Sequence, residues 1–144
     1  PAWAQTAVDD YLARFPRDFT VIVKEVKAEA RTGGKPVAQV MAAEAERIER
    51  AVPAGDILVA MDEHGRDMTT VDFSKKISGW KNEGCGVTFI IGGADGLDPA
   101  LKAKSRMMLR LSSMTLPHAF ARVLLTEQIY RAWSILANHP YHRV

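Results

Sequence analysis

The chain has 144 residues, of which 47% are hydrophobic and 25% charged, with one cysteine and a formal net charge of +2. This length and composition fit one compact domain and exclude a disordered, collagen-like or disulfide-stapled chain. Cys85 cannot pair within the chain, no apolar run approaches the roughly 18 residues of a membrane span, and residues 1–10 do not resemble a signal peptide, so we expect a cytoplasmic protein.

The net charge is unevenly distributed along the sequence. Residues 1–97 hold 12 basic and 15 acidic side chains, whereas residues 98–144 hold 7 basic and 2 acidic ones, which gives net charges of −3 and +5. A basic half is compatible with a polyanionic partner such as a nucleic acid, although a solvated, mildly basic surface is the commoner cause.

The first half of the chain predicts, in order, a helix, a strand, a second helix and a second strand. Apolar residues recur every four positions over residues 3–15 and stop before a proline, which predicts a helix. Residues 19–26 are rich in β-branched side chains and predict a strand, which a basic loop follows at residues 31–36. Residues 37–52 have helical apolar spacing, and the apolar run at residues 56–61 is typical of a strand buried on both faces.

The second half continues the alternation of helices and strands. Its predicted elements are a polar loop at 62–68, a helix capped by Thr69 or Thr70, a strand at 87–91, a short helix from Asp98 to Lys104, a strand at 107–111 and a long helix at 118–138. This order predicts an α/β fold with a mainly parallel sheet flanked by helices. Ligands bind such sheets at the carboxyl ends of the strands, where loops begin at Asp62, Gly92 and Ser112.

A glycine-rich segment follows the strand at residues 87–91. Gly92, Gly93 and Gly96 can let backbone N–H groups approach a ligand closely, but a tight strand-to-helix turn explains these glycines equally well. The segment matches neither the dinucleotide-binding nor the phosphate-loop pattern. A Rossmann-type oxidoreductase and a nucleotide-hydrolysing enzyme are therefore disfavoured.

The other polar clusters predict neither a metal site nor acyl transfer. His139 and His142 lie beyond the last helix and on either side of a proline, so nothing aligns them as metal ligands. Ser112 and Ser113 precede His118, but they lack the nucleophile-elbow pattern of acyl-transfer enzymes.

The terminal residues 139–144 are more informative, because they concentrate an aromatic ring, two histidines and an arginine. Tyr141 can stack on a base, His142 can move a proton and Arg143 can bind phosphate. The alternative is a helix end stabilised by cationic side chains.

Four ordered motifs give these residues a context. IIGGADGL (90–97), LSSMTLPH (111–118), EQIYRAWSILAN (127–138) and NHPYHR (138–143) together resemble the SPOUT methyltransferases, and more narrowly the ribosomal large-subunit pseudouridine methyltransferase H family. The resemblance implies a homodimeric enzyme with a C-terminal trefoil knot. It implies methyl transfer from S-adenosylmethionine to N3 of a pseudouridine in large-subunit (23S) ribosomal RNA, on the assembled ribosome. It further implies that residues 1–144 form a single domain that lacks the family's first β-strand.

The resemblance also assigns site residues. The cofactor-binding residues are expected at the three strand ends, and they are Met61, Gly92, Gly93, Ser112, Ser113, Met114, Thr115, Leu116 and Pro117. Ile91, Met114 and Leu116 are expected to supply an apolar wall for the adenosyl group. By their position in the tail, Tyr141, His142 and Arg143 are the catalytic candidates, with His142 as the possible general base.

Two alternatives remain at the level of the sequence. The chain is either this enzyme or a non-catalytic module that binds the ribosome or RNA. The last helix also carries Phe120, Leu124, Tyr130 and Trp133 beside its core-facing stripe. An apolar surface of this width on the helix fits packing against a second copy of the chain, and it equally fits one buried helix with a wide core contact.

Overall fold

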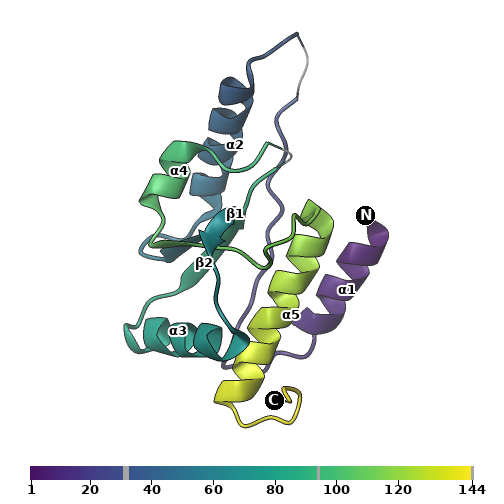
Figure 1. Ribbon diagram of the computed structural model, residues 1–144, viewed down its shortest axis with the longest axis vertical. Coiled ribbons are helices and arrows are strands. Elements are labelled where there is room, and N and C mark those ends of the chain that lie inside the picture. The colour runs from purple at the N-terminus through teal and green to yellow at the C-terminus, as the bar shows by residue number, and fades with distance from the viewer. Residues whose placement is uncertain (31–32, 94, 144) are drawn as a thin grey trace.

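The structure, a computed structural model, describes residues 1–30, 33–93 and 95–143 (Figure 1). Its elements are α1 (Ala2–Leu12), α2 (Val37–Ala51), β1 (Ile57–Arg66), α3 (Thr70–Asn82), β2 (Val87–Ile91), α4 (Pro99–Lys104), β3 (Met107–Leu109) and α5 (His118–Leu136). Each predicted helix is present within a few residues of its expected bounds. Part of the predicted loop at 31–36 and Ala94 of the glycine-rich segment lie outside the described residues.

The sheet has the order β2-β1-β3, and both neighbours of β1 run parallel to it. The register is continuous from Ile57 opposite Val87 to Met61 opposite Ile91. The predicted parallel sheet is therefore confirmed, with the apolar run at residues 57–61 as its central strand.

Alternate residues of β1 face two separate layers of helices. Val59 and Met61 pack in a cluster with Phe73 and Leu125, which belong to α3 and α5. Ala60 faces the other way, into a cluster with side chains of α2, β2 and α4. Figure 1 shows α2 and α4 on one side of the sheet and α3 and α5 on the other, with α1 beside α5. Because both faces are covered there, residues 57–61 of the central strand carry no charge.

Polar residues begin two of the helices as the sequence predicts. The Thr69 hydroxyl accepts a hydrogen bond from the Asp72 N–H at 3.1 Å at the start of α3. The Asp98 carboxylate accepts from the Ala100 N–H at 2.8 Å, and Pro99 occupies the first turn of α4. These contacts satisfy N–H groups that have no partner within the helix.

The predicted strand at residues 19–26 is wrong, since this segment forms no strand. Its neighbours are side chains rather than another strand. Lys24 donates to the Ala51 carbonyl at 3.3 Å, Arg47 donates to the Lys27 carbonyl at 3.1 Å, and Glu25 pairs with Arg122. β-branched residues favour an extended backbone, but a strand also requires a neighbouring backbone to bond with.

The predicted polar loop at 62–68 is also wrong in part, because β1 continues through it to Arg66. Pairing with β3 is irregular between Met61 and Arg66. A Cβ on Gly65 would lie 2.7 Å from the Leu109 backbone, so the two strands approach closely at this position. β3 itself ends at Leu109, two residues earlier than expected. Within the described ranges, no helix is long and apolar enough to cross a membrane.

Candidate functional site

The last residues of β2 and β3 lie level with Met61 of β1, beyond which β1 continues irregularly to Arg66. Met61 stands opposite Ile91 on β2 and opposite Leu109 on β3. The loops predicted to form a site therefore leave the sheet at a common edge. Met61 is buried in the core, whereas Ile91 is half-buried at this edge.

Side-chain contacts connect the three loops. The His118 ring nitrogen Nδ1 lies 3.0 Å from the Gly92 carbonyl oxygen, which links the glycine-rich turn to the start of α5. The Thr115 hydroxyl donates to the Glu63 carboxylate at 3.4 Å, which links the loop before α5 to the end of β1. The structure thus brings together the cofactor-loop segments that sequence reasoning selected.

Asp62 follows Met61 in β1 and fixes the irregular part of that strand through two hydrogen bonds. Its carboxylate accepts hydrogen bonds from the His64 N–H at 2.8 Å and from Lys102 Nζ at 3.0 Å. Burial raises the pKa of Asp62, but these two hydrogen bonds and the Lys102 charge outweigh burial and hold that pKa below its usual range. The carboxylate is therefore ionised at neutral pH and joins β1 to α4.

The glycines of the second loop have two different roles. A Cβ on Gly92 would lie 2.5 Å from the Gly96 carbonyl carbon, and Gly96 has a φ of +83°. A tight turn therefore explains both of these glycines. Gly93 is exposed, and a Cβ there would meet only the flexible carboxylate of Glu44 at 3.0 Å. Of the two predicted cofactor-binding glycines, Gly93 is the exposed one, and its carbonyl accepts from the Gly96 N–H at 3.0 Å.

The third loop combines a fixed turn with an exposed apolar side chain. The Ser112 hydroxyl accepts from the Met114 N–H at 2.9 Å, and Met114 is 76% exposed. Leu116 is half-buried, and Ser113, Thr115 and Pro117 are exposed. Together with Ile91 these groups offer backbone donors and acceptors beside apolar surface, which suits a flat and largely neutral ligand.

The terminal residues form a separate cluster at the other end of α5. The Tyr141 hydroxyl donates to Glu127 Oε1 at 3.0 Å and lies 3.2 Å from the Tyr11 hydroxyl. Burial, together with the hydrogen bonds to Tyr11 and Glu127 and the Glu127 charge, raises the pKa of Tyr141 well above its usual value. The phenol is therefore a neutral donor at physiological pH.

The other tail residues have different partners. His142 Nδ1 lies 3.4 Å from an Arg131 guanidinium nitrogen, and Arg143 is exposed. His139 Nδ1 accepts from the Tyr141 N–H at 3.2 Å, so the two tail histidines bond to different groups. Across residues 1–30, 33–93 and 95–143, no three His, Cys, Asp or Glu side chains are grouped as metal ligands.

The strand-end loops and the tail lie far apart within one chain. α5 spans 19 residues from His118 to Leu136. At a rise of 1.5 Å per residue its length is about 28 Å. Figure 1 shows the start of α5 beside the loops and the C-terminal tail turning back beside the last turns of the helix, where His142 lies next to Arg131, about 20 Å along α5 from His118. One copy of the chain thus separates the two sets of candidate residues.

Hydrophobic side chains remain exposed along α5 and α1. Trp3 is 48% exposed and Phe120 is 51% exposed, and their rings pack with centroids 4.8 Å apart. Leu124, one turn further along α5, is 39% exposed. Tyr130 is buried and stacks on Trp133 within the chain. The broad apolar stripe predicted on the last helix is thus partly internal and partly open.

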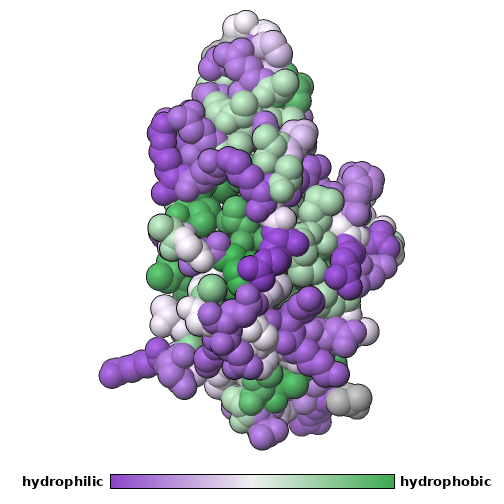
Figure 2. Space-filling model, turned by 90° about the vertical axis from the view of Figure 1, so that its left-hand side faces the viewer, coloured by the Kyte–Doolittle hydropathy of each residue, from purple (hydrophilic) through white to green (hydrophobic). Residues whose placement is uncertain are grey.

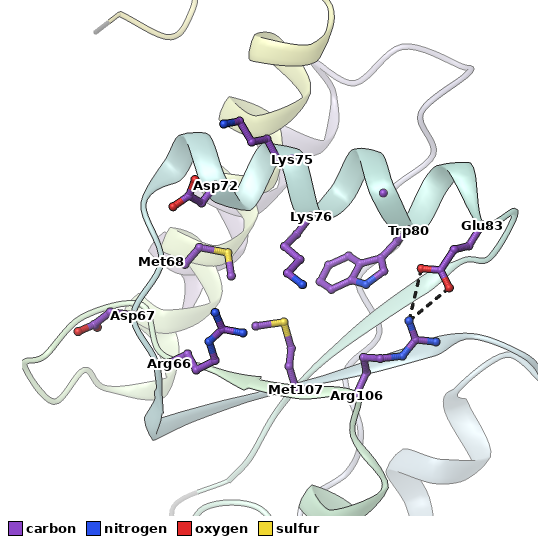
Figure 3. A pocket seen from close by; sticks show the side chains of 11 residues that line it. Arg66, Asp67, Met68, Asp72, Lys75, Lys76, Trp80, Glu83, Arg106 and Met107 are labelled. Atoms are coloured by element: carbon purple, nitrogen blue, oxygen red, sulfur yellow. Dashed lines mark hydrogen bonds and ion pairs between the residues drawn. The ribbon is translucent and has the colours of Figure 1, made fainter.

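Two cavities in the described part of the fold are lined by none of the predicted cofactor or catalytic residues. The larger, of about 620 Å³, lies between α3 and the strands β1 and β3. Figure 3 shows Lys76 and Trp80 entering it from α3, and Arg66 and Met107 from the strands. Side chains of both signs line it, and Arg106 pairs with Glu83 at 3.4 Å across one end. These features describe a solvated groove.

The surface seen from the left of Figure 1 has a similarly mixed character. Figure 2 shows hydrophobic residues gathered in a hollow at mid-height, surrounded by hydrophilic ones. A smaller cavity of about 190 Å³ lies beside the end of β3 and is lined in part by Phe73, Leu109 and Leu125. The residues that line this cavity include none of the predicted cofactor or catalytic residues.

Sequence reasoning missed the partners of the tail. Tyr11, Glu127 and Arg131 hold Tyr141, yet none was a candidate residue. The four-residue spacing of Glu127 and Arg131 on one helix predicts their ion pair. The contact of Tyr11 with Tyr141 spans 130 positions and left no local signal.

Comparison with known proteins agrees with the motifs. The family described as "Predicted SPOUT methyltransferase" matches residues 1–142. A protein named Ribosomal RNA large subunit methyltransferase H from Bordetella avium is 57% identical over 99% of this chain and 92% of its own length. Proteins of the same name from Ralstonia pickettii and Burkholderia cenocepacia are each 53% identical, over 100% and 99% of this chain, and over 92% of their own lengths.

Proposed function

Since the chain belongs to the SPOUT methyltransferase family, whose members use S-adenosylmethionine as methyl donor, we propose that it methylates large-subunit ribosomal RNA. The acceptor is N3 of a pseudouridine on the assembled ribosome, in the cytoplasm. Met61 lies level with the last residues of β2 and β3, and contacts of Gly92 with His118 and of Glu63 with Thr115 join the segments that follow, which is the observation that carries this proposal.

The strand-end loops suit the adenosyl part of S-adenosylmethionine. This group supplies an electrophilic methyl on a sulfonium sulfur. Met61, Gly92 and Gly93, with residues 112–117, would hold it, because exposed Gly93 and half-buried Ile91 flank Gly92, which His118 joins to the loop that carries half-buried Leu116. An adenine edge needs such backbone donors and acceptors, and its faces need apolar walls.

The tail supplies the groups that act on the acceptor nucleotide. N3 of pseudouridine carries a proton that must leave, and the His142 imidazole accepts it. The exposed Arg143 guanidinium binds a backbone phosphate. Tyr141 completes the tail, with its hydroxyl held by Glu127. The protein's main contribution is to position nucleophile and methyl group in line.

A homodimer places the two sets of residues together. Within one chain His142 lies beside Arg131, about 20 Å along α5 from the loops that meet His118. Trp3, Phe120 and Leu124 leave an apolar face exposed on α1 and α5, where a second copy can pack. An antiparallel pairing along α5 sets the loops of one subunit beside the tail of the other. Each site then contains residues of both chains.

A methylation assay tests the proposal. Ribosomes from a strain that lacks the modification are incubated with the protein and S-adenosylmethionine, and the product nucleoside is mapped by mass spectrometry. We expect one N3-methylated pseudouridine in the large-subunit RNA. Ribosome binding without methylation, together with no calorimetric binding of S-adenosylmethionine, would instead identify a non-catalytic ribosome-binding module.

A further inference from the structure

Glu127 lies at the centre of the contacts that hold the tail. Its side chain is only 13% exposed. Oε1 accepts from Arg131 Nε at 2.8 Å and from the Tyr141 hydroxyl at 3.0 Å, while Oε2 accepts from Gln128 at 2.9 Å. A carboxylate with three donors is fixed in position, and hydrogen bonds to a charged acceptor are stronger than neutral ones.

The Tyr141 ring is enclosed as well as hydrogen-bonded. The Arg131 guanidinium carbon lies 4.8 Å from its centroid, and the Tyr130 ring meets it edge to face at 4.7 Å. The Tyr11 hydroxyl approaches from α1. A ring with these neighbours joins the tail to both α1 and α5, so Tyr141 acts as an anchor.

The rest of the tail has few backbone contacts. The helix ends at Leu136, Asn138 turns the chain with a φ of +56°, and the His139 N–H donates to the Ser134 carbonyl at 2.8 Å. Beyond that point the tail contacts described by the structure are made through the Tyr141, His139 and His142 side chains and the Tyr141 N–H. Chain ends held so loosely fray when an anchor is lost.

We propose that Glu127 is a positioning residue for methyl transfer: its carboxylate, oriented by Arg131, holds the Tyr141 hydroxyl and thereby sets the location of His142 and Arg143. This inference rests on the proposed function. It gives Tyr141 the task of fixing the tail, in place of a direct contact with the RNA base.

Two conservative variants and their combination test the inference. Tyr141→Phe removes the hydroxyl and keeps the ring, while Glu127→Gln keeps an acceptor oxygen and removes the charge that orients Arg131. We expect the single-turnover rate at saturating ribosome concentration to fall about tenfold in Tyr141→Phe and about fivefold in Glu127→Gln. The double variant should be no slower than about tenfold, because both changes break one contact.

Two measurements separate positioning from a loss of fold or of cofactor. Calorimetric affinity for S-adenosylmethionine should stay within about twofold of the parent in all variants, since the described contacts of Glu127 are to Gln128, Arg131 and Tyr141 rather than to the cofactor loops. Amide hydrogen exchange at residues 139–143 should be faster, with exchange in α1 and β1 unchanged. Glu46→Gln is the matched control, since it removes an exposed ion pair of the same four-residue spacing with Arg50, and its rate should equal that of the parent.

The outcomes that overturn the inference are distinct from those that overturn the function. A slow Tyr141→Phe beside a fully active Glu127→Gln would show that Tyr141 acts on the RNA directly. Full activity in both, with a freely exchanging tail, would show that the anchor is irrelevant to catalysis. If the parent protein does not methylate ribosomes, the proposed function fails, and unchanged exchange in the variants would also refute the anchor.

Discussion

The residues around the start of α5 and those along its second half differ in chemical character. At its start, His118 meets a backbone carbonyl, and residues 112–117 of the neighbouring loop are all uncharged. Along its second half, Glu127 and Arg131 enclose Tyr141 in a network of charged and aromatic side chains. The first set suits recognition of a small, flat ligand through backbone groups, and the second suits contact with a polyanion and movement of protons.

This difference bears on the proposed homodimer. A methyl transfer requires donor and acceptor within contact distance, yet His142 lies beside Arg131, about 20 Å along α5 from the loops at His118. The exposed apolar face on α1 and α5 lies along the same helix. In the proposed homodimer, this face pairs the two sets of residues that one chain holds apart.

The variant with the largest expected effect disturbs only the glycine-rich loop near the start of α5. Gly92→Ala places a Cβ 2.5 Å from the Gly96 backbone, so the turn must open. We expect affinity for S-adenosylmethionine to fall about a hundredfold by calorimetry, because core contacts this close cannot be accommodated without a backbone shift. Gly79→Ala, at an open helical position, should keep the affinity and gain up to about 1 kcal/mol of stability. Parental affinity in Gly92→Ala would contradict the assignment of this loop.

The variant with the next largest expected effect disrupts the proposed dimer interface. Phe120→Glu puts a charge on the half-exposed apolar face beside Trp3. We expect the dimer dissociation constant, measured by sedimentation, to rise at least about tenfold, because burial of an unpaired charge costs several kcal/mol. Methylation should fall with dimer content. Val37→Glu, equally exposed on α2, should leave both unchanged. A parent that is monomeric at micromolar concentration would refute the interface.

A variant in the tail is expected to have a smaller effect. His142→Ala removes the candidate proton acceptor, and we expect single-turnover methylation to fall about tenfold, at the low end of what general bases contribute. Affinity for S-adenosylmethionine should not change. A rate within about threefold of the parent would show that the N3 proton leaves to water.

The smallest effect is a pH dependence confined to the tail. Because the pKa of Tyr141 is raised on folding, its contribution to stability is complete below the unfolded value of about 10 and is lost as the pH rises above it. Urea unfolding between pH 8 and 11 should therefore show a steeper loss of stability in the parent than in Tyr141→Phe. Equal slopes would mean that the phenol is not held by Glu127.

Much of the fold was predictable because local patterns decided it. The apolar runs at 57–61 and 87–91 could only be buried strands, and Thr69 and Asp98 marked helix starts through their own side chains. Residues 19–26 carry an equally strong β pattern and form no strand. Strand formation depends on a neighbouring backbone, which no local pattern reports. The implied trefoil knot stays a prediction, because periodicity carries no information about threading.

The candidate site was predictable in its parts and not in its arrangement. The strand-end rule located the loops, and composition drew attention to Tyr141, His142 and Arg143. Neither showed that α5 holds these groups apart. That separation follows from the helix length together with the Tyr141 contacts to Tyr11 and Glu127, which join distant parts of the sequence.

Subunit complementation tests the shared site most directly. One subunit carries Gly92→Ala, its partner carries His142→Ala with Arg143→Ala, and the mixed dimer is purified with two affinity tags. Both parent homodimers should be inactive. The mixed dimer holds one intact pair of loops and tail, so it should recover about half of the wild-type rate per dimer, one of two equivalent sites. A mixed dimer as inactive as its parents would contradict a site built from two chains.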